Sequence, residues 1–152
     1  MIQTKNYILT KKDYAKIIIS KRIKKSWWLY AIMIVMGLIY LPSFGKDSFS
    51  SFFVLFAFIY PIAIVIYLWV WAYSKGHEPI FSETKLSFDD NFLYFEQSEN
   101  ETKLSPGTIQ NIVSNNDYLL LYISKGRFIY IPKNIFYSTE DFNKFSSLIN
   151  RT

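Results

Sequence analysis

Two long uncharged runs dominate the chain: SWWLYAIMIVMGLIYLPSFG (residues 26–45) and SFSSFFVLFAFIYPIAIVIYLWVWAYS (residues 48–74), separated only by Lys46 and Asp47. A helix needs roughly 20 apolar residues to cross the hydrocarbon core of a bilayer, which is about 30 Å thick. Both runs meet that length. The alternative is a pair of buried helices in a soluble domain, but uncharged runs this long are typical of membrane spans. The pattern predicts a transmembrane helical hairpin.

Charge and aromatic residues orient the hairpin. Residues 1–25 hold eight basic residues and a single acidic one, Asp13. Basic flanks stay on the cytoplasmic side of a membrane. The four tryptophans lie at the start of the first run and the end of the second, so an antiparallel hairpin places them at one interface. We expect a multi-pass protein with both termini in the cytoplasm.

The composition argues against several classes of function. The chain has no Cys and one His, and no charged residue lies inside either uncharged run, where transporters usually need one. Metalloprotease, phosphate-loop and serine-hydrolase motifs are absent. Asp89-Asp90-Asn91 suits a β-turn better than a cation site. We therefore expect a protein that is not an enzyme and uses no cofactor or metal.

The basicity belongs to the arm before the hairpin. Residues 75–152 carry eight basic and ten acidic residues. A nucleic-acid-binding domain usually carries its basic patch on the folded part, so we expect no nucleic-acid partner. Membrane lipids and a protein are the expected partners, and a homo-oligomer is compatible with the sequence.

Local patterns divide the chain into three parts. Residues 1–25 hold an expected strand, Lys5 to Leu9, and a helix that a capping box at Thr10–Asp13 begins. Residues 26–74 form the hairpin. Residues 79–152 form a β-rich domain with six expected strands: Lys85 to Phe88, Phe92 to Glu96, Glu101 to Leu104, Ile109 to Val113, Tyr118 to Ser124 and Arg127 to Ile131.

A capped helix is expected to close this β-rich domain. Ser138-Thr139-Glu140-Asp141 is a second capping box. Four apolar side chains then recur at helical spacing: Phe142, Phe145, Leu148 and Ile149. That face is expected to pack into the core. The fold class is thus a membrane helical hairpin plus an α+β domain, with a small antiparallel sandwich or barrel and a C-terminal helix.

The order of strands, the motif Ile131-Pro132-Lys133-Asn134-Ile135-Phe136 and the short capped helix resemble the YcxB-like family. The resemblance covers Thr84 to Ile149 most clearly. It implies a small protein of the bacterial inner membrane with two spans and a cytoplasmic pleckstrin-homology-like barrel closed by the last helix. The chain departs from the family at Pro106, where a Trp is frequent. The resemblance implies a fold more than an activity.

A pleckstrin-like barrel needs about seven strands, and only six follow the hairpin. This leads to the hypothesis that the strand at Lys5 to Leu9 supplies the seventh. The hairpin would then be an insertion into the edge of the barrel.

The candidate site residues are basic. We consider anionic-lipid binding for two groups, one on the arm and one on the last strand pair: Lys21, Arg22, Lys24 and Lys25, and Lys125, Arg127 and Lys133. The alternative is that the first group only fixes topology and the second is a solvated rim.

Two functional hypotheses follow from the sequence. In the first, a non-enzymatic membrane protein binds a protein partner through its cytoplasmic domain, and a specific form of it is an immunity protein that neutralises a toxin. In the second, the basic residues serve an anionic-lipid or envelope-stress sensor.

Overall fold

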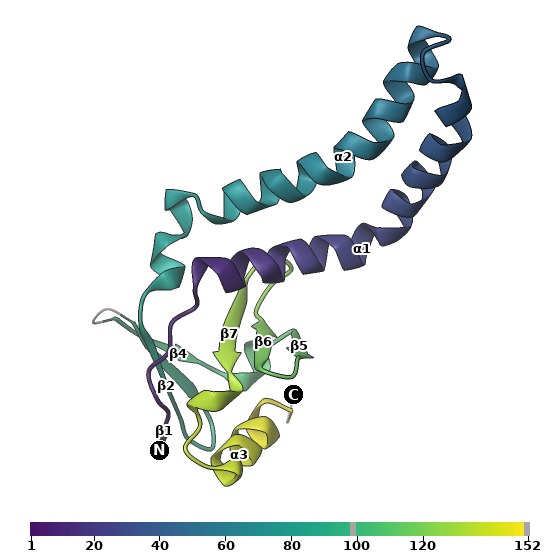
Figure 1. Ribbon diagram of the computed structural model, residues 1–152. Helices are drawn as coiled ribbons and strands as arrows, with labels where there is room; N and C mark the ends of the chain where they lie inside the picture. Colours follow the sequence, from purple (N-terminus) through teal and green to yellow (C-terminus); the bar gives the residue numbers. More distant parts are fainter. Residues whose placement is uncertain (98–99, 151–152) are drawn as a thin grey trace. The chain divides into compact units, whose positions relative to one another are not determined.

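The computed structural model describes residues 1–97 and 100–150, which fall into two units. Unit 1 combines Met1–Leu9 with the chain from Ile80 onward, and unit 2 is Thr10–Pro79. The first nine residues therefore belong with the β-rich part, and the basic arm belongs with the hairpin. Figure 1 shows the helices and strands.

Unit 2 is the helical hairpin. Helix α1 runs over Lys11–Tyr40, and α2 over Ser48–Ala72. A 3-10 turn, Leu41–Ser43, follows α1, and another, Lys75–Phe81, follows α2 and leads into unit 1. Both helices are long and apolar enough to cross a membrane. In their most apolar 18-residue windows only 6% and 11% of residues are buried, so they are not packed as core helices are.

Helix α1 joins the predicted arm to the first predicted span. The hydroxyl of Thr10 accepts a hydrogen bond from the Asp13 amide at 3.1 Å and donates one to the Asp13 carboxylate at 2.6 Å, which confirms the cap. The only non-helical residue inside α1 is Ser26, with φ −120° and ψ 15°. The arm and the span thus meet at Ser26, where the sequence changes from basic to apolar.

Unit 1 contains two antiparallel sheets. The first has the strand order β1-β2-β3-β4, with β1 Ile2–Gln3, β2 Thr84–Phe88, β3 Leu93–Gln97 and β4 Asn100–Leu104. The second has the order β5-β6-β7, with β5 Asn111–Ser114, β6 Tyr118–Tyr122 and β7 Phe128–Pro132. The six strands predicted after the hairpin are confirmed within about two residues at each end. The described strands do not close into a barrel.

The amino-terminal strand joins the first sheet but lies elsewhere than predicted. Strand β1 is Ile2–Gln3, and it pairs with the end of β2. Within the predicted strand Lys5 to Leu9, Tyr7 alone makes a β-bridge, to Thr84. The prediction of a strand at 5–9 was wrong, because the described residues there form no continuous ladder beyond the bridge at Tyr7; Leu9 is buried, but Ile8 is 53% exposed.

Helix α3, Thr139–Ile149, packs against the core of unit 1. Ser138 accepts a hydrogen bond from the Asp141 amide at 3.1 Å, so the second cap is confirmed. The fully buried Phe145 contacts the rings of Phe88 and Phe136 at centroid distances of 5.4 and 5.1 Å. The register of β2 and β3 places further side chains in this core, because Leu86 on β2 pairs with Phe95 on β3 and both are buried.

Candidate functional site

The basic residues predicted on the last strand pair do not converge. Lys125 and Arg127 lie in the exposed β6–β7 turn, where the Arg127 carbonyl accepts a hydrogen bond from the Ile123 amide at 3.1 Å. Lys133 follows the other end of β7, and its amide donates to the Asp117 carbonyl at 2.8 Å. The five residues of β7 separate the two positions by roughly 17 Å at about 3.4 Å per residue. One small anion cannot contact all three at once.

Lys133 has an aromatic neighbour instead. Its ammonium lies 5.8 Å from the centre of the Phe142 ring. A cation within about 6 Å of a ring face is attracted to it. The lysine of the Ile-Pro-Lys motif therefore sits against α3.

The basic residues predicted on the arm lie on α1, directly before the break at Ser26. Lys21, Arg22, Lys24 and Lys25 are all exposed. Successive helical residues are rotated by about 100°, so the four side chains spread around the helix. Of the four, Lys24 lines a groove on the hairpin and the other three do not.

The candidate binding site in unit 1 is a mouth between the two sheets. The mouth is a cavity of about 260 Å³ with residues from five separate segments, the following ten: Tyr7, Leu9, Ile80, Thr84, Phe95, Gln97, Thr102, Phe128, Ile129 and Tyr130. Thr84 begins β2, whereas Phe88 at its other end packs on α3. Helix α3 therefore covers one end of the strands, and the mouth is open at the opposite end.

The mouth has apolar walls with a few polar groups. Phe95 and Leu9 are buried, and Gln97 and Thr102 supply polar side chains. Desolvation of the hydroxyl raises the pKa of Tyr7, and nearby Tyr130 raises it further. Tyr7 is therefore neutral at physiological pH, and its hydroxyl is suited to hydrogen bonding and not to proton abstraction. This chemistry favours binding of a largely apolar group.

Sequence reasoning missed the mouth. Its residues are spread from Tyr7 to Tyr130, and only pairing of the N-terminal segment with β2 brings them together. One signal was available, because Phe95 ends a run, Phe92 to Phe95, that is apolar on both faces of its predicted strand.

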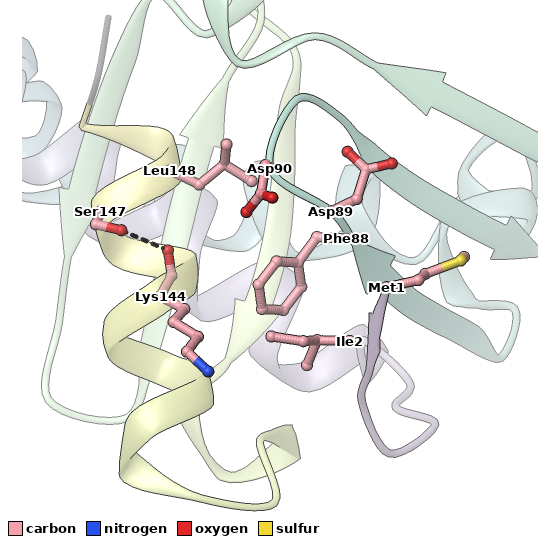
Figure 2. A pocket seen from close by; sticks show the side chains of 8 residues that line it. All are labelled: Met1, Ile2, Phe88, Asp89, Asp90, Lys144, Ser147 and Leu148. Carbon is pink, nitrogen blue, oxygen red and sulfur yellow. Dashed lines mark hydrogen bonds between the residues drawn. The ribbon is translucent and has the colours of Figure 1, made fainter.

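A second hollow, of about 290 Å³, lies between β1, the β2–β3 turn and α3. Figure 2 shows its side chains, with Lys144 and Ser147 on α3 and Asp89 and Asp90 on the turn. The Ser147 hydroxyl donates to the Lys144 carbonyl at 2.8 Å (Figure 2). The Ser147 hydroxyl and the Lys144 carbonyl are thus already used in a hydrogen bond within α3.

Asp89 holds the turn that the sequence predicted. Its carboxylate accepts hydrogen bonds from the amides of Asn91 and Phe92, each at 2.8 Å, and from the Tyr94 hydroxyl at 2.9 Å. The Asn91 amide, followed by the other two donors, holds the pKa of Asp89 below its usual value. The three donors occupy the carboxylate, and residues 1–97 and 100–150 contain no group of three metal-ligating side chains.

Comparison with known proteins supports the family resemblance for the β-rich unit. Residues 88–149 match the family model described as YcxB-like protein. The matched segment runs from the end of β2 to the end of α3 and leaves both long apolar helices outside it. No curated protein and no solved structure shows significant similarity to the chain. Pro106, at the point of departure from the family pattern, begins a short 3-10 turn, Pro106–Thr108.

Proposed function

We propose that the protein is a non-enzymatic binding module held at the bacterial inner membrane, and that the mouth of unit 1 takes an apolar side chain from a protein partner. The mouth carries this proposal. Its volume of about 260 Å³ lies below the roughly 300–1,000 Å³ of small-molecule sites, so it suits one or two side chains better than a whole cofactor.

The chemistry of the mouth supports a protein partner. Buried aromatic anchors that fill pockets dominate the energy of protein interfaces. Here Phe95 and Leu9 form apolar walls, while Gln97 and Thr102 add polar side chains to them. A specific form of the proposal is an immunity protein whose partner is a membrane-active toxin.

The proposed fold of unit 1 is a partly open relative of the pleckstrin-homology-like barrel. Four plus three antiparallel strands, followed by a helix that packs into the core, support it. The strand from the amino terminus brings the count to the seven that such a barrel needs.

The proposed topology places both termini in the cytoplasm, and the basic arm supports it. Because the chain has no cysteine, single cysteines can test it. Lys46→Cys, in the loop between the helices, should react with an impermeant maleimide in intact cells. Lys125→Cys should react only after lysis. The reverse pattern would contradict the proposal.

Photocrosslinking tests the proposed partner. A benzoylphenylalanine at Phe128, in the mouth, should crosslink one stoichiometric protein in cells of the native host. The same probe at Tyr137, which is 68% exposed and outside the mouth, should not. Thr102→Trp, which fills the mouth, should abolish the adduct. Equal crosslinking from both positions, or persistence of the adduct in Thr102→Trp, would refute the mouth as the binding site.

The second candidate function is the anionic-lipid or envelope-stress sensor. The exposure of the four basic residues beside Ser26 favours it. Neutralising all seven predicted basic residues should then abolish the preference of the protein for liposomes that contain anionic lipid. Full retention by that variant would exclude this role.

A further inference from the structure

The hairpin carries a groove where the basic part of α1 passes the last turns of α2. Its volume is about 550 Å³, and all of its lining residues belong to unit 2. From α1 the apolar lining is Ala15, Ile19 and Ile23, which are spaced four residues apart and so share one face of the helix. From the end of α2 and its C-cap the lining is Trp69 and Tyr73, also four apart.

The aromatic wall of the groove is open on one side. The rings of Trp69 and Tyr73 stack with centroids 6.1 Å apart and planes inclined by 22°. Trp69 is 55% exposed and Tyr73 40%, and Ile23 across the groove is 42% exposed. Trp71, in contrast, contacts Tyr14, with centroids 6.5 Å apart, and so helps to join the two helices. The exposed pair thus presents a large apolar surface at the end of a predicted span.

The rim of the groove is basic. Lys12, Lys16 and Lys24 line it and are exposed, and no acidic residue is among the described residues that line it. Lys12 and Lys16 lie one helical turn apart, about 6 Å at 1.5 Å per residue. They stand at the end of α1 farthest from the apolar span. From there the lining becomes apolar through Ile19 and Ile23 toward Ser26.

We propose that this groove binds one anionic phospholipid. The phosphodiester lies between the ammonium groups of Lys12 and Lys16, and an acyl chain runs along Ile19 and Ile23 against Trp69. Lys24 lies about 12 Å further along α1 than Lys16, so its long stem covers the chain and its ammonium adds positive charge to the groove. Indole and lysine side chains both favour this interfacial depth.

The charge selects the lipid class. A zwitterionic lipid would bring its own cation toward three lysines, whereas a lipid with a net negative headgroup leaves its phosphate free to pair with them. The inference rests on the hairpin lying in a membrane, which is part of the proposed function. It adds a site and a ligand class that the protein-binding mouth does not require.

Quenching of Trp69 fluorescence tests the site. Trp27, Trp28 and Trp71 are changed to Phe in the full-length chain, which leaves Trp69 as the only tryptophan. The protein is reconstituted in phosphatidylcholine vesicles that contain a minority of phosphatidylglycerol. Bromine is placed on the acyl chains of one lipid or the other. We expect brominated phosphatidylglycerol to quench Trp69 far more than an equal mole fraction of brominated phosphatidylcholine.

Two matched triple variants locate the effect. Lys12→Gln/Lys16→Gln/Lys24→Gln removes the groove lysines, and the relative association constant for phosphatidylglycerol should fall by about fivefold for each lysine lost. Lys21→Gln/Arg22→Gln/Lys25→Gln removes the same charge from the same helix outside the groove. It should keep most of the preference. A variant with Trp71 as the only tryptophan should show a weaker preference than Trp69.

Each other outcome overturns the inference. Equal losses in the two triple variants would mean diffuse attraction to the surface without a site. Equal quenching by both brominated lipids would mean no selectivity. Quenching that falls as the protein-to-lipid ratio rises would mean that a second copy of the chain occupies the groove. Absence of quenching by either lipid would instead contradict the proposed membrane location.

Discussion

A single carboxylate, that of Asp89, organises the turn between β2 and β3. It accepts from two backbone amides and from the Tyr94 hydroxyl. The same bond raises the pKa of Tyr94, because loss of the phenol proton would remove a donor to a carboxylate and place two negative charges together. Lys103 completes the cluster, with its ammonium 3.7 Å from the centre of the Phe92 ring.

The depressed pKa of Asp89 predicts an acid-sensitive contribution to stability. A carboxyl whose pKa is lower in the folded state stabilises the fold above its unfolded pKa, near 4, and loses that effect as the pH falls through the folded pKa. Asp89→Asn keeps an acceptor but not the charge. The difference in melting temperature between wild type and Asp89→Asn should therefore be largest at neutral pH and disappear at pH values well below 4.

Circular dichroism of the detergent-solubilised protein at a series of pH values measures this. Asp90→Asn is the matched control, because Asp90 lies in the same turn, whereas the turn amides donate to Asp89. A constant difference between wild type and Asp89→Asn across the acid range would contradict the prediction.

The two long helices pack tightly together at Gly37. A Cβ at this position would lie 3.0 Å from the Ala57 Cβ and 3.2 Å from the Phe58 ring. Ala57 is fully buried. Small residues allow helix backbones to come close in a membrane, where packing rather than water drives association.

Gly37→Leu should therefore force α1 and α2 apart. Overpacking of a tight contact costs about 1–3 kcal/mol, and we expect loss of hairpin stability of that order. The matched control is Ala31→Leu, which adds a large side chain at an exposed position of the same helix. Thermal unfolding in detergent should separate the two variants, and equal behaviour would show that the contact is not tight.

Unit 1 is assembled from both sides of the hairpin. The Thr4 hydroxyl, almost fully buried, donates to the Leu86 carbonyl at 2.9 Å, and the Lys5 amide donates to the Ile135 carbonyl at 2.9 Å. Tyr7 and Thr84 exchange two backbone hydrogen bonds, at 2.9 and 2.8 Å. Residues that precede the hairpin thus complete a sheet that follows it.

Replacing residues 2–8 with a Gly-Ser segment of equal length should destabilise unit 1 while leaving its connection to α1 intact. The increase in amide hydrogen exchange should be larger in β2, which loses its neighbour β1, than in β6, which keeps both of its partners. Exchange by mass spectrometry measures this. Unchanged protection of β2 would show that the N-terminal segment adds nothing to the sheet.

The sequence allowed prediction wherever a local signal determined the structure. Both capping boxes, at Thr10 and Ser138, and the turn at Asp89 were predicted because their hydrogen bonds join residues two or three apart. Two features had no such signal. Strand β1 is too short to show alternation, and the mouth requires Tyr7 to meet Tyr130.

The candidate basic site illustrates the same limit. Lys125 and Lys133 are only eight residues apart in the sequence, but a strand between them carries them to opposite ends of β7. Lys12 and Lys16, by contrast, were assigned only to the basic arm, because the groove forms only where α2 lies beside α1.

The pairing of β1 with β2 has a consequence for biosynthesis. Ile2 leaves the ribosome well before its partner Phe88, which emerges only after both long helices have been made. At about 5–20 residues per second the wait is roughly 4–17 s. Throughout that interval the first nine residues have no sheet to join, and under the proposed topology they wait for it on the cytoplasmic side of the membrane. A ribosome stalled before residue 88 therefore leaves the N-terminal segment without the β2 residues that it pairs with, and the first sheet cannot be completed.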